Sequence, residues 1–352
     1  MKGFLKRYLH VILLLALSLV MLAACGSNTS SGSGSKPVIH LAYYPNITHA
    51  VAIVGVARGT FQQVLGNNVT IDTKTFSAGP AEIEALFAGD IDIGFVGPNP
   101  AINGYVQSHG QALRIIGGAS SGGVLFVTRP GANIKTAADL AGKKIADPQL
   151  GNTQDVALRY YLQQHNLKPA DKGGNVQIVP TDPANILTLF KQGSIDGAWV
   201  PEPWATRLID EGKGQVFVNE RSLWPNGSFV TTNIVVRTAF LNQHPDLVSK
   251  FLKATVETVQ YINNNPVAAR TLVNSEIKRI TGKAIASNEI TQAFSDVGIT
   301  YDPLASTLLI SADRAYALGY LGSSKPNLSG IYDLTPLNQV LQGQGLSAVT
   351  GP

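Results

Sequence analysis

The chain carries two copies of one local pattern, and each copy predicts a helix, a turn and a strand. The first copy spans residues 80–100 and the second spans 183–203. Each opens with proline, whose fixed φ and missing N–H suit the first position of a helix. A glycine follows at the expected end of each helix, Gly89 or Gly193, and a short apolar strand comes next. Two equivalent helix–strand units predict two parts of the chain that are built alike.

Both copies finish in Pro-x-Pro, at residues 98–100 and 201–203. Proline has no N–H to donate to a strand ladder, so each strand is expected to stop there and to leave a stiff loop at its carboxyl end. Ligands bind at this edge of open α/β sheets. The repeat therefore predicts two lobes that face each other across a cleft.

Residues 1–24 predict a signal peptide. Three basic residues precede an apolar run at 11–22, which is too short to be a good membrane span. The run ends in Leu-Ala-Ala before Cys25, which resembles the lipobox of bacterial lipoproteins, so we expect lipidation of Cys25. The alternative is an ordinary signal peptide with an unrelated cysteine. Residues 25–36, rich in Ser and Gly, predict a flexible tether that holds the protein outside the cytoplasm, at the cell membrane.

The charge balance gives no evidence for a nucleic-acid partner. The chain has 27 Lys and Arg against 23 Asp and Glu, a formal charge of +4. Three of the basic residues lie within residues 1–24, so 24 remain against 23 once this segment is removed. A balance of +1 lacks the excess of positive charge that binding to phosphate backbones requires.

The sequence also offers little catalytic chemistry. Cys25 is the only cysteine, which excludes disulfides, a thiol nucleophile elsewhere and a cysteine-based metal site. The 6 histidines are scattered, and none is spaced as metal ligands are. The motifs of serine hydrolases, zinc proteases and phosphate-binding loops are absent. We therefore expect no catalytic residue, no metal and no cofactor, and any ATP hydrolysis must belong to another chain.

The remaining residues are too many for one core and fit two lobes. The first lobe is predicted at 37–125 plus 234–352, and the second at 126–233. Strand, helix and strand are expected at 39–43, 48–61 and 69–76, and again at 144–146, 153–166 and 176–179. This alternation predicts an α/β fold with two parallel-rich sheets that are flanked by helices.

Two extended, β-branched segments, 123–128 and 229–236, are expected to connect the lobes as hinge strands. Helices dominate after the second of them. One opens at residues 244–246 with an apolar stripe at helical spacing, and another is expected from Asp302 to Leu321. We expect these helices to pack against the first lobe.

Loops at the expected strand ends hold the candidate ligand contacts. Tyr44 and Asn46 follow the first strand, where a fixed turn would present a ring, a hydroxyl and an amide. Asn99, between two prolines, can offer a donor and an acceptor together. Ser121 and Gly122 supply a hydroxyl and an unhindered backbone N–H. The alternatives are structural: half-buried packing, a plain turn or simple flexibility.

Gly151, Asn152, Thr153 and Gln154 open the first helix expected in the second lobe. Unpaired N–H groups and the positive end of the helix dipole make such a terminus an anion site without Arg or Lys. The alternative is ordinary capping, with Asn152 as N-cap and Asp155 at the third helical position. A cap and a ligand can use different N–H groups, so we predict both.

Glu202 and Trp204 lie on the loop that ends the second copy. Trp204 could cover apolar ligand surface, and Glu202 could accept a hydrogen bond or pair with an amine. Thr232 adds a short polar side chain to a segment otherwise expected to be apolar. The alternative for the tryptophan is a place in the core. His49, just inside the first helix, is expected to be a polar residue of the helix start and not a catalyst.

Three stretches carry a resemblance to the solute-binding proteins of ABC importers, in the branch for aliphatic sulfonates, nitrate and taurine. They are residues 78–80 with 88–94, 134–136 with 139–146, and 199–205. The resemblance covers essentially the whole chain after the signal segment. It implies a bilobal periplasmic-binding-protein-like (type II) fold, with the ligand enclosed between the lobes at the helix starts and strand ends named above.

The resemblance also implies a function and partners. A small anionic or zwitterionic solute, an aliphatic sulfonate first, would be captured by hinge closure and delivered to a permease with separate ATPase subunits. The protein is expected to be a monomer and not an enzyme. The alternatives are a binding protein for nitrate, taurine or a thiamine- or pyrimidine-type precursor, or a sensor that uses the same cleft. An enzyme of the pyrimidine-precursor type shares this architecture, but the lack of reactive Cys and clustered His argues against it.

One departure from the family leaves the solute open. No basic residue is clearly placed in the cleft, because Arg129, Arg207 and Arg237 lie near the expected hinges or loops. An oxyanion would then depend on N–H groups and hydroxyls. Glu202 would oppose it unless the ligand also carries a cation, which keeps taurine-like zwitterions and uncharged heterocycles as candidates.

Overall fold

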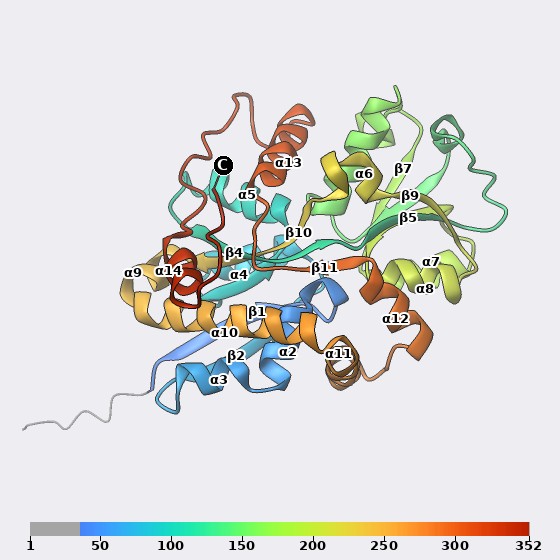
Figure 1. Cartoon of the computed structure of the whole chain (residues 1–352). Helices are drawn as coiled ribbons and strands as arrows, with labels where there is room; N and C mark the ends of the chain where they lie inside the picture. The colour runs from blue at the N-terminus through green and yellow to red at the C-terminus, as the bar shows by residue number, and fades with distance from the viewer. Residues whose placement is uncertain (1–35, 352) are drawn as a thin grey trace, which may run out of the picture. The chain divides into compact units, whose positions relative to one another are not determined.

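The computed structural model describes residues 36–351, and the chain from Pro37 onward forms one compact unit. The predicted signal peptide, Cys25 and the predicted tether up to residue 35 lie outside the described residues. Helices surround two sheets, which confirms the predicted bilobal α/β fold (Figure 1). None of the helices within residues 36–351 is long and apolar enough to cross a membrane.

The first sheet has six strands in the order β11-β4-β10-β3-β1-β2. They are β1 (Val38–Tyr43), β2 (Thr70–Thr75), β3 (Ile93–Val96), β4 (Leu113–Gly122), β10 (Val230–Arg237) and β11 (Val297–Ile299). β1 pairs in parallel with β2 and β3, as the alternation of strands and helices predicts. β10 runs antiparallel between β3 and β4, and β11 runs antiparallel to β4. The sheet is mixed because the returning strand inserts between strands of the first lobe.

The second sheet has five strands in the order β7-β6-β8-β5-β9. They are β5 (Val124–Thr128), β6 (Lys144–Asp147), β7 (Gln177–Pro180), β8 (Gly197–Pro201) and β9 (Gln215–Asn219). β6 pairs in parallel with β7 and β8, and β5 runs antiparallel to β8 and β9. Both sheets therefore share one plan, with a parallel triplet at one edge and an antiparallel crossing strand beside it.

An aspartate common to both copies of the repeat explains why that part of the sequence recurs. Asp92 accepts hydrogen bonds from a backbone N–H of β1 at 3.0 Å and from Arg237 of β10 at 2.6 Å. Asp196 likewise accepts from a backbone N–H of β6 at 2.9 Å and from Arg129, just after β5, at 3.2 Å. Each aspartate bonds the middle strand of its parallel triplet to the arginine of the crossing strand. Arg129 and Arg237 are therefore engaged by the sheets.

The chain passes from the first sheet to the second at Gly122 and Gly123, between β4 and β5. Both residues have positive φ, 71° and 68°, where glycine avoids the steric cost of a Cβ. A Cβ on Gly123 would also lie 2.3 Å from the Val297 side chain. The return runs from β9 through η5 (Glu220–Leu223) and η6 (Pro225–Gly227) to β10.

The predicted lobe limits remain a proposal. The chain changes sheet at residues 122–123 and again between 219 and 230. These two places lie within a few residues or within one loop of the predicted limits at 125 and 233. Two crossings in close proximity are the arrangement that a hinge between lobes requires.

The helices around the first sheet correct two predictions. They are η2 (Ile47–His49), α2 (Ala50–Ala57), α3 (Thr60–Leu65), α4 (Gly79–Phe87) and α5 (Pro98–Gln107). The single helix predicted at 48–61 is wrong, because Gly59, with φ 69°, separates α2 from α3. The stiff loop predicted after the first copy is also wrong, because Pro98 occupies the first turn of α5 directly after Gly97.

The second lobe follows its prediction more closely. Its helices are η3 (Ala137–Leu140), α6 (Thr153–Gln164), η4 (Ala170–Lys172), α7 (Pro183–Lys191) and α8 (Trp204–Asp210). A short turn at 202–203 separates β8 from α8. Trp199 in β8 is fully buried and stacks on Phe126 of β5 with ring centroids 5.2 Å apart. This pair stabilises the packing of the second sheet.

The C-terminal part is helical, as predicted. Its helices are α9 (Thr238–Gln243), α10 (Pro245–Asn264), α11 (Pro266–Thr281), α12 (Ser287–Ser295), α13 (Ala305–Ala317) and α14 (Thr335–Gly343). The predicted stripe of α10 is confirmed, since all of its members are buried: Leu247, Val248, Phe251, Leu252, Val256 and Val259. Burial of each such side chain contributes roughly 1.5–3 kcal/mol. α10 packs on α2, α3 and α14 at the first sheet.

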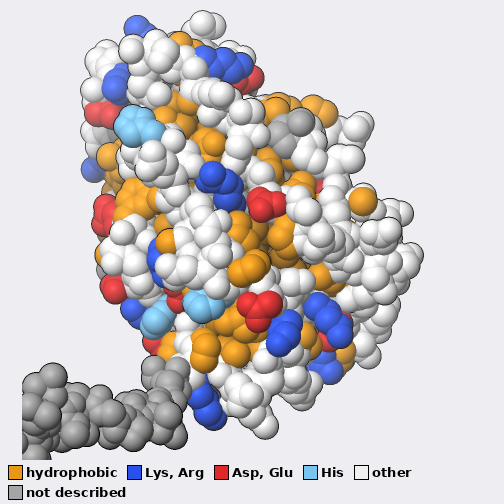
Figure 2. All heavy atoms as spheres, turned by 90° about the vertical axis from the view of Figure 1, so that its left-hand side faces the viewer, with side chains coloured by type: hydrophobic (Ala, Val, Ile, Leu, Met, Phe, Trp, Pro, Cys, Tyr) orange, Lys and Arg blue, Asp and Glu red, His pale blue; other side chains and the backbone are white. Residues whose placement is uncertain are grey.

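α13 differs from its prediction in start and in position. Asp302 Oδ1 accepts a hydrogen bond from Leu304 N at 2.8 Å, and Leu304 has φ 46°, so the helix begins only at Ala305. α13 packs on α5 of the first lobe and also on α6 of the second. The helix therefore spans the boundary between the two sheets (Figure 1). Elsewhere, acidic and basic side chains are interspersed on the face drawn in Figure 2, in keeping with the nearly balanced charge.

Candidate functional site

A cavity of about 30 Å³ lies between the two sheets. One wall comes from the loop after β1 and from the N-termini of α4 and α5, including Tyr44 and Gly97. The opposite wall comes from the N-termini of α6 and α7 and from the end of β8, including Thr153 and Pro183. Thr232 of β10 also lines it. This is the cleft that the repeated strand ends predict.

Four helix N-termini converge on the cavity, and each adds positive potential. α4 contributes Gly79, α5 its N-cap Gly97, α6 its N-cap Asn152 and α7 its first residue Pro183. Each terminus carries the equivalent of about half a positive charge. The residues that line the cavity include no Lys, Arg, Asp or Glu. The site can therefore stabilise an anion through backbone dipoles alone.

Two buried hydroxyls at the cavity, Thr153 Oγ1 and Thr232 Oγ1, lack a hydrogen-bond partner in the structure, whereas the Tyr44 hydroxyl lies against the buried Glu82 carboxyl. A buried polar group without a partner costs about 1–3 kcal/mol, so a ligand that bonds to it recovers this energy. A Cβ on Gly97 would lie 2.4 Å from Thr153 Oγ1, so glycine permits the close approach of the two walls.

The start of α6 confirms the predicted cap. Asn152 Oδ1 accepts a hydrogen bond from Gln154 N at 2.6 Å. Asp155 Oδ2 accepts one from Gly151 N at 2.8 Å, which completes the box-like arrangement one residue earlier than in a standard capping box. Capping alone leaves the Thr153 hydroxyl without a partner. The ligand role predicted for these residues remains a prediction.

His49 and Tyr44 form a neutral pair at the cavity. Their rings lie 4.1 Å apart, and Tyr44 N donates to His49 Nδ1 at 3.4 Å. Burial lowers the pKa of His49 to about 3, so the imidazole is uncharged at neutral pH. The position agrees with the expectation of a helix-start residue, since His49 ends η2 just before α2. Its place at the cavity was not foreseen, because no partner for it is visible in the sequence.

Glu82, in the first turn of α4, is a buried acid that sequence analysis missed. Its side chain is fully buried and lies against the Tyr44 hydroxyl. Burial raises the pKa of Glu82 to about 8, and burial together with the neighbouring Glu82 carboxyl raises the pKa of Tyr44. In the sequence Glu82 resembles any polar residue on the outside of a helix, and no signal marks it.

Half of the predicted ligand residues line the cavity. These are Tyr44, Asn46, Asn152, Thr153, Gln154 and Thr232. The other six do not line it: Asn99, Ser121, Gly122, Gly151, Glu202 and Trp204. All twelve remain predictions as ligand contacts.

Several of the residues that do not line the cavity have structural partners. Asn99 Nδ2 donates to Ser311 O at 3.4 Å, and the Gly122 carbonyl accepts from Thr231 at 2.6 Å. The Ser121 carbonyl accepts from Arg221 at 3.0 Å. The contacts of Ser121 and Gly122 hold the crossing between the sheets, and the Asn99 contact joins α5 to α13.

Glu202 and Trp204 are also engaged. The two Glu202 oxygens accept from the N–H and the hydroxyl of Thr206 at 3.1 and 3.0 Å, which caps α8. Burial raises the pKa of Glu202 to about 8. Trp204 Nε1 donates to Asn46 Oδ1 at 3.0 Å, and this bond joins the two sides of the cleft.

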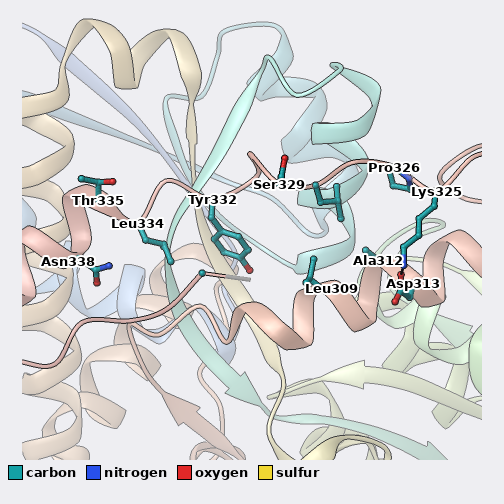
Figure 3. A pocket seen from close by; sticks show the side chains of 12 residues that line it. Leu309, Ala312, Asp313, Lys325, Pro326, Ser329, Tyr332, Leu334, Thr335 and Asn338 are labelled. Atoms are coloured by element: carbon teal, nitrogen blue, oxygen red, sulfur yellow. Dashed lines mark ion pairs between the residues drawn. The ribbon is translucent and has the colours of Figure 1, made fainter.

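A larger groove, of about 610 Å³, lies away from the cleft (Figure 3). It is lined by α13 and the segments that follow it, including Leu309, Leu328 and Tyr332. Lys325 and Asp313 form an ion pair of 2.6 Å at its mouth. All its lining residues belong to the C-terminal part of the chain, so lobe closure would not enclose a ligand there. The interlobe cavity is therefore the better candidate. Residues 36–351 contain no cluster of His, Cys, Asp and Glu that could hold a metal.

Comparison with known proteins supports the fold and the family of the chain. The model of the NMT1-like family matches residues 32–275. The taurine-binding periplasmic protein of Escherichia coli is 30% identical over 234 residues, which cover 66% of this chain and 69% of that protein.

Two solved structures show the same fold. The alkanesulfonate-binding protein of Xanthomonas axonopodis, bound to MOPS, superposes with a TM-score of 0.67 at 18% identity, over 81% of this chain and 94% of that one. The nitrate-binding protein of Synechocystis superposes with a TM-score of 0.70 at 16% identity, over 87% and 88%.

Proposed function

Because this chain belongs to the NMT1-like family, we propose that it is the solute-binding component of an ABC importer, with an aliphatic sulfonate as the first candidate solute. The observation that carries this proposal is the interlobe cavity, where four helix N-termini and two hydroxyls without partners, those of Thr153 and Thr232, converge. Taurine and nitrate are the alternatives, since similar proteins are named for them. The relatives are binding proteins, which supports a role without catalysis.

The cavity favours an anion without an amine. A sulfonate presents three acceptor oxygens, which match N–H and hydroxyl donors. An ammonium group would need an acidic partner, and no Asp or Glu lines the cavity. Glu202, which was predicted to pair with an amine, accepts hydrogen bonds from Thr206 instead. We therefore place a simple alkanesulfonate ahead of taurine.

Binding proceeds by closure of the two lobes about the crossings at 122–123 and 219–230. A cavity of about 30 Å³ has room for one or two waters, whereas small-molecule sites occupy roughly 300–1,000 Å³. A sulfonate can therefore enter only when the lobes separate. Because it contacts both walls only in the closed form, its differential affinity shifts the equilibrium toward closure.

The setting of this function follows from the N-terminal sequence and the relatives. Cleavage before Cys25 and lipidation would anchor a monomeric protein to the outer side of the cell membrane, with the cleft free to sample solute. The closed form would then be recognised by a permease that works with separate ATPase subunits. Mass spectrometry of the membrane fraction tests the anchor, since lipidated Cys25 predicts a diacylglyceryl mass on the first peptide.

Titration calorimetry tests the function. We expect one-to-one binding of ethanesulfonate or a longer alkanesulfonate, and weaker binding of taurine. Binding of nitrate or of a thiamine precursor alone would keep the fold and reassign the solute. Turnover of any of these compounds by the purified protein would overturn the proposal and favour an enzyme.

A further inference from the structure

A second groove, here called the outer groove, lies directly outside the cavity. It measures about 530 Å³ and is lined by Pro45, Ala184 and Pro203, among others. Pro45 and Ala184 adjoin the cavity-lining residues Asn46 and Pro183, and Pro203 lies two residues after cavity-lining Pro201. The same three chain segments therefore separate the cavity from the outer groove.

Trp204 forms the partition between the two spaces. Its side chain lines the outer groove, and its Nε1 donates to Asn46 Oδ1 of the opposite lobe at 3.0 Å. Beside this bond, Ile47 N donates to the Glu202 carbonyl at 3.2 Å. Both bonds join the loop after β1 to the turn before α8, so both must break when the lobes separate.

The outer groove contains the basic side chains that the cavity lacks. Lys191 of α7, Arg207 of α8 and Lys283 after α11 all line it, and Glu211 is its only acidic lining residue. Glu211 forms an ion pair with each of the three, at 3.5 Å from Lys191, 2.7 Å from Arg207 and 3.7 Å from Lys283. One carboxylate cannot neutralise three cations, so the lining of the groove has a formal excess of +2.

The surrounding acids are less exposed to the groove. Glu289 is 6% exposed, and burial raises its pKa. Asp210 accepts a hydrogen bond from Asn288 at 2.7 Å. Neither lines the groove, whereas Lys191 and Lys283 side chains are 48% and 70% exposed. The charge that a small ion meets inside the groove is therefore positive.

We propose that the outer groove is the entry site for the solute, where Lys191, Arg207 and Lys283 concentrate small anions beside the Trp204–Asn46 partition before the cavity opens. The cavity then binds the anion through helix dipoles and hydroxyls, without basic side chains. Separating the two tasks lets positive charge raise the association rate without holding the anion in the closed site. The identity of the solute rests on the proposed function, but the local excess of anions does not.

Quenching of Trp204 fluorescence tests whether the outer groove concentrates anions, with the full-length protein in neutral detergent. The other tryptophans, Trp199 and Trp224, are 0% and 8% exposed, so Trp204 should give most of the quenchable signal, and Trp204→Phe checks this assignment. Iodide should quench Trp204 more strongly than caesium. In the double variant Lys191→Gln, Lys283→Gln, the iodide quenching constant should fall about twofold at low salt, while quenching by neutral acrylamide is unchanged.

Lys253→Gln is the matched control. This lysine lies on α10 in an exposed pair with Glu257, at 4.0 Å, and does not line the groove. Its loss should leave iodide quenching as in the parent. Equal iodide quenching of the parent and the double variant would overturn the proposal. A parallel fall in acrylamide quenching would also overturn it, because access and not charge would then have changed.

Stopped-flow binding of ethanesulfonate separates this proposal from the proposed function. We expect the double variant to bind severalfold more slowly at low salt, with the difference reduced at high salt and the dissociation rate unchanged. An effect on dissociation alone would contradict an entry role. If ethanesulfonate does not bind the parent at all, the sulfonate assignment fails, and the quenching measurement still decides whether the groove concentrates anions.

Discussion

At the scale of single residues, the candidate site is marked by polar groups that the fold buries without partners. Thr153 and Thr206 make a useful pair, because both hydroxyls are buried at the start of a helix in the second lobe. The Thr206 hydroxyl donates to Glu202 at 3.0 Å, whereas the Thr153 hydroxyl has no partner in the structure. Removing the structural hydroxyl should therefore lower the stability of the protein, whereas removing the hydroxyl that is free for a ligand should lower ligand affinity and not stability.

Thr153→Val should weaken alkanesulfonate binding about tenfold and leave the ligand-free protein as stable as the parent or more so, because an unsatisfied hydroxyl is removed. Thr206→Val should lower the free energy of unfolding by about 1–3 kcal/mol, because it removes a partner from buried Glu202. Calorimetry and urea unfolding measure the two effects. If Thr153→Val binds as tightly as the parent, the hydroxyl is not a ligand contact.

Glu82 predicts a dependence of stability on pH. Its pKa is about 8 in the folded protein against 4.5 in the unfolded chain, so the folded state holds a proton that the unfolded state loses between these values. Stability therefore falls as pH rises from about 5 to 8. Glu82→Gln should reduce this fall by on the order of 2–4 kcal/mol, measured by urea unfolding across that range.

Part of the fall should remain in Glu82→Gln, because Glu202 also has a pKa of about 8. Glu84→Gln is the control, since Glu84 is exposed on the same helix. An identical pH dependence in the parent and in Glu82→Gln would mean that Glu82 is not held neutral in the folded protein.

The role of a residue could be predicted from the sequence where that role depends only on the adjacent backbone. The Asn152 cap could be predicted because capping depends only on the residues beside it. Glu82 and His49 could not, because their burial is produced by segments far away in the sequence. Trp204 was predicted to lie at the cleft from the sequence. Its bond to Asn46 could not be predicted, because it depends on the closed arrangement of both lobes.

At the scale of elements, α6 is held by a group from outside its own lobe. Tyr320, which follows α13, donates through its hydroxyl to Asp155 of α6. Asp155 also accepts from Gly151 N at 2.8 Å and from Arg159 at 2.7 Å, so one carboxylate connects the end of α13 with the N-terminus that lines the cavity. The contact stabilises the closed arrangement without touching the cavity.

Tyr320→Phe should therefore weaken alkanesulfonate binding roughly tenfold, because the closed form alone loses a hydrogen bond to a carboxylate. Tyr316→Phe is the matched control, because its hydroxyl donates to Ser323 O at 3.3 Å near the surface. Calorimetry on both variants gives the comparison. Equal affinities in the two variants would show that the Tyr320 contact does not contribute to closure.

Elements with a strong local pattern were predicted well. The stripe of α10 and the repeated helix–strand units depend on periodicity and on proline and glycine at element ends, which the sequence contains. The failures are at boundaries set by single backbone conformations. Gly59 breaks the predicted helix and Leu304 delays α13, and both have positive φ. The contact of α13 with both lobes could not be predicted, because it depends on the way the sheets face each other.

At the scale of the whole described unit, two sheets of one plan are joined where the chain crosses at Gly122 and Gly123. The repeat predicts this duplication, and the two extended segments begin where the chain enters β5 and β10, while the predicted lobe limits remain a prediction. The antiparallel pairings of β5 and β10 were not predicted, because strand alternation gives no information on a strand that returns from the other lobe. The lobes can close only by a change of backbone conformation at the crossing. Substitutions of its glycines should therefore impair both stability and closure.

Gly123→Ala and Gly142→Ala separate backbone strain from packing at the crossing. Both glycines have positive φ, 68° and 76°, so each alanine should cost about 1–2 kcal/mol of stability. A Cβ at Gly142 meets nothing within 4 Å, whereas one at Gly123 lies 2.3 Å from Val297 of β11. Gly123→Ala should therefore be the less stable variant in urea unfolding, and it alone should weaken ligand binding, because β11 must shift against the crossing. If both variants lose the same stability and keep the parent's affinity, the crossing is not the point about which the lobes close.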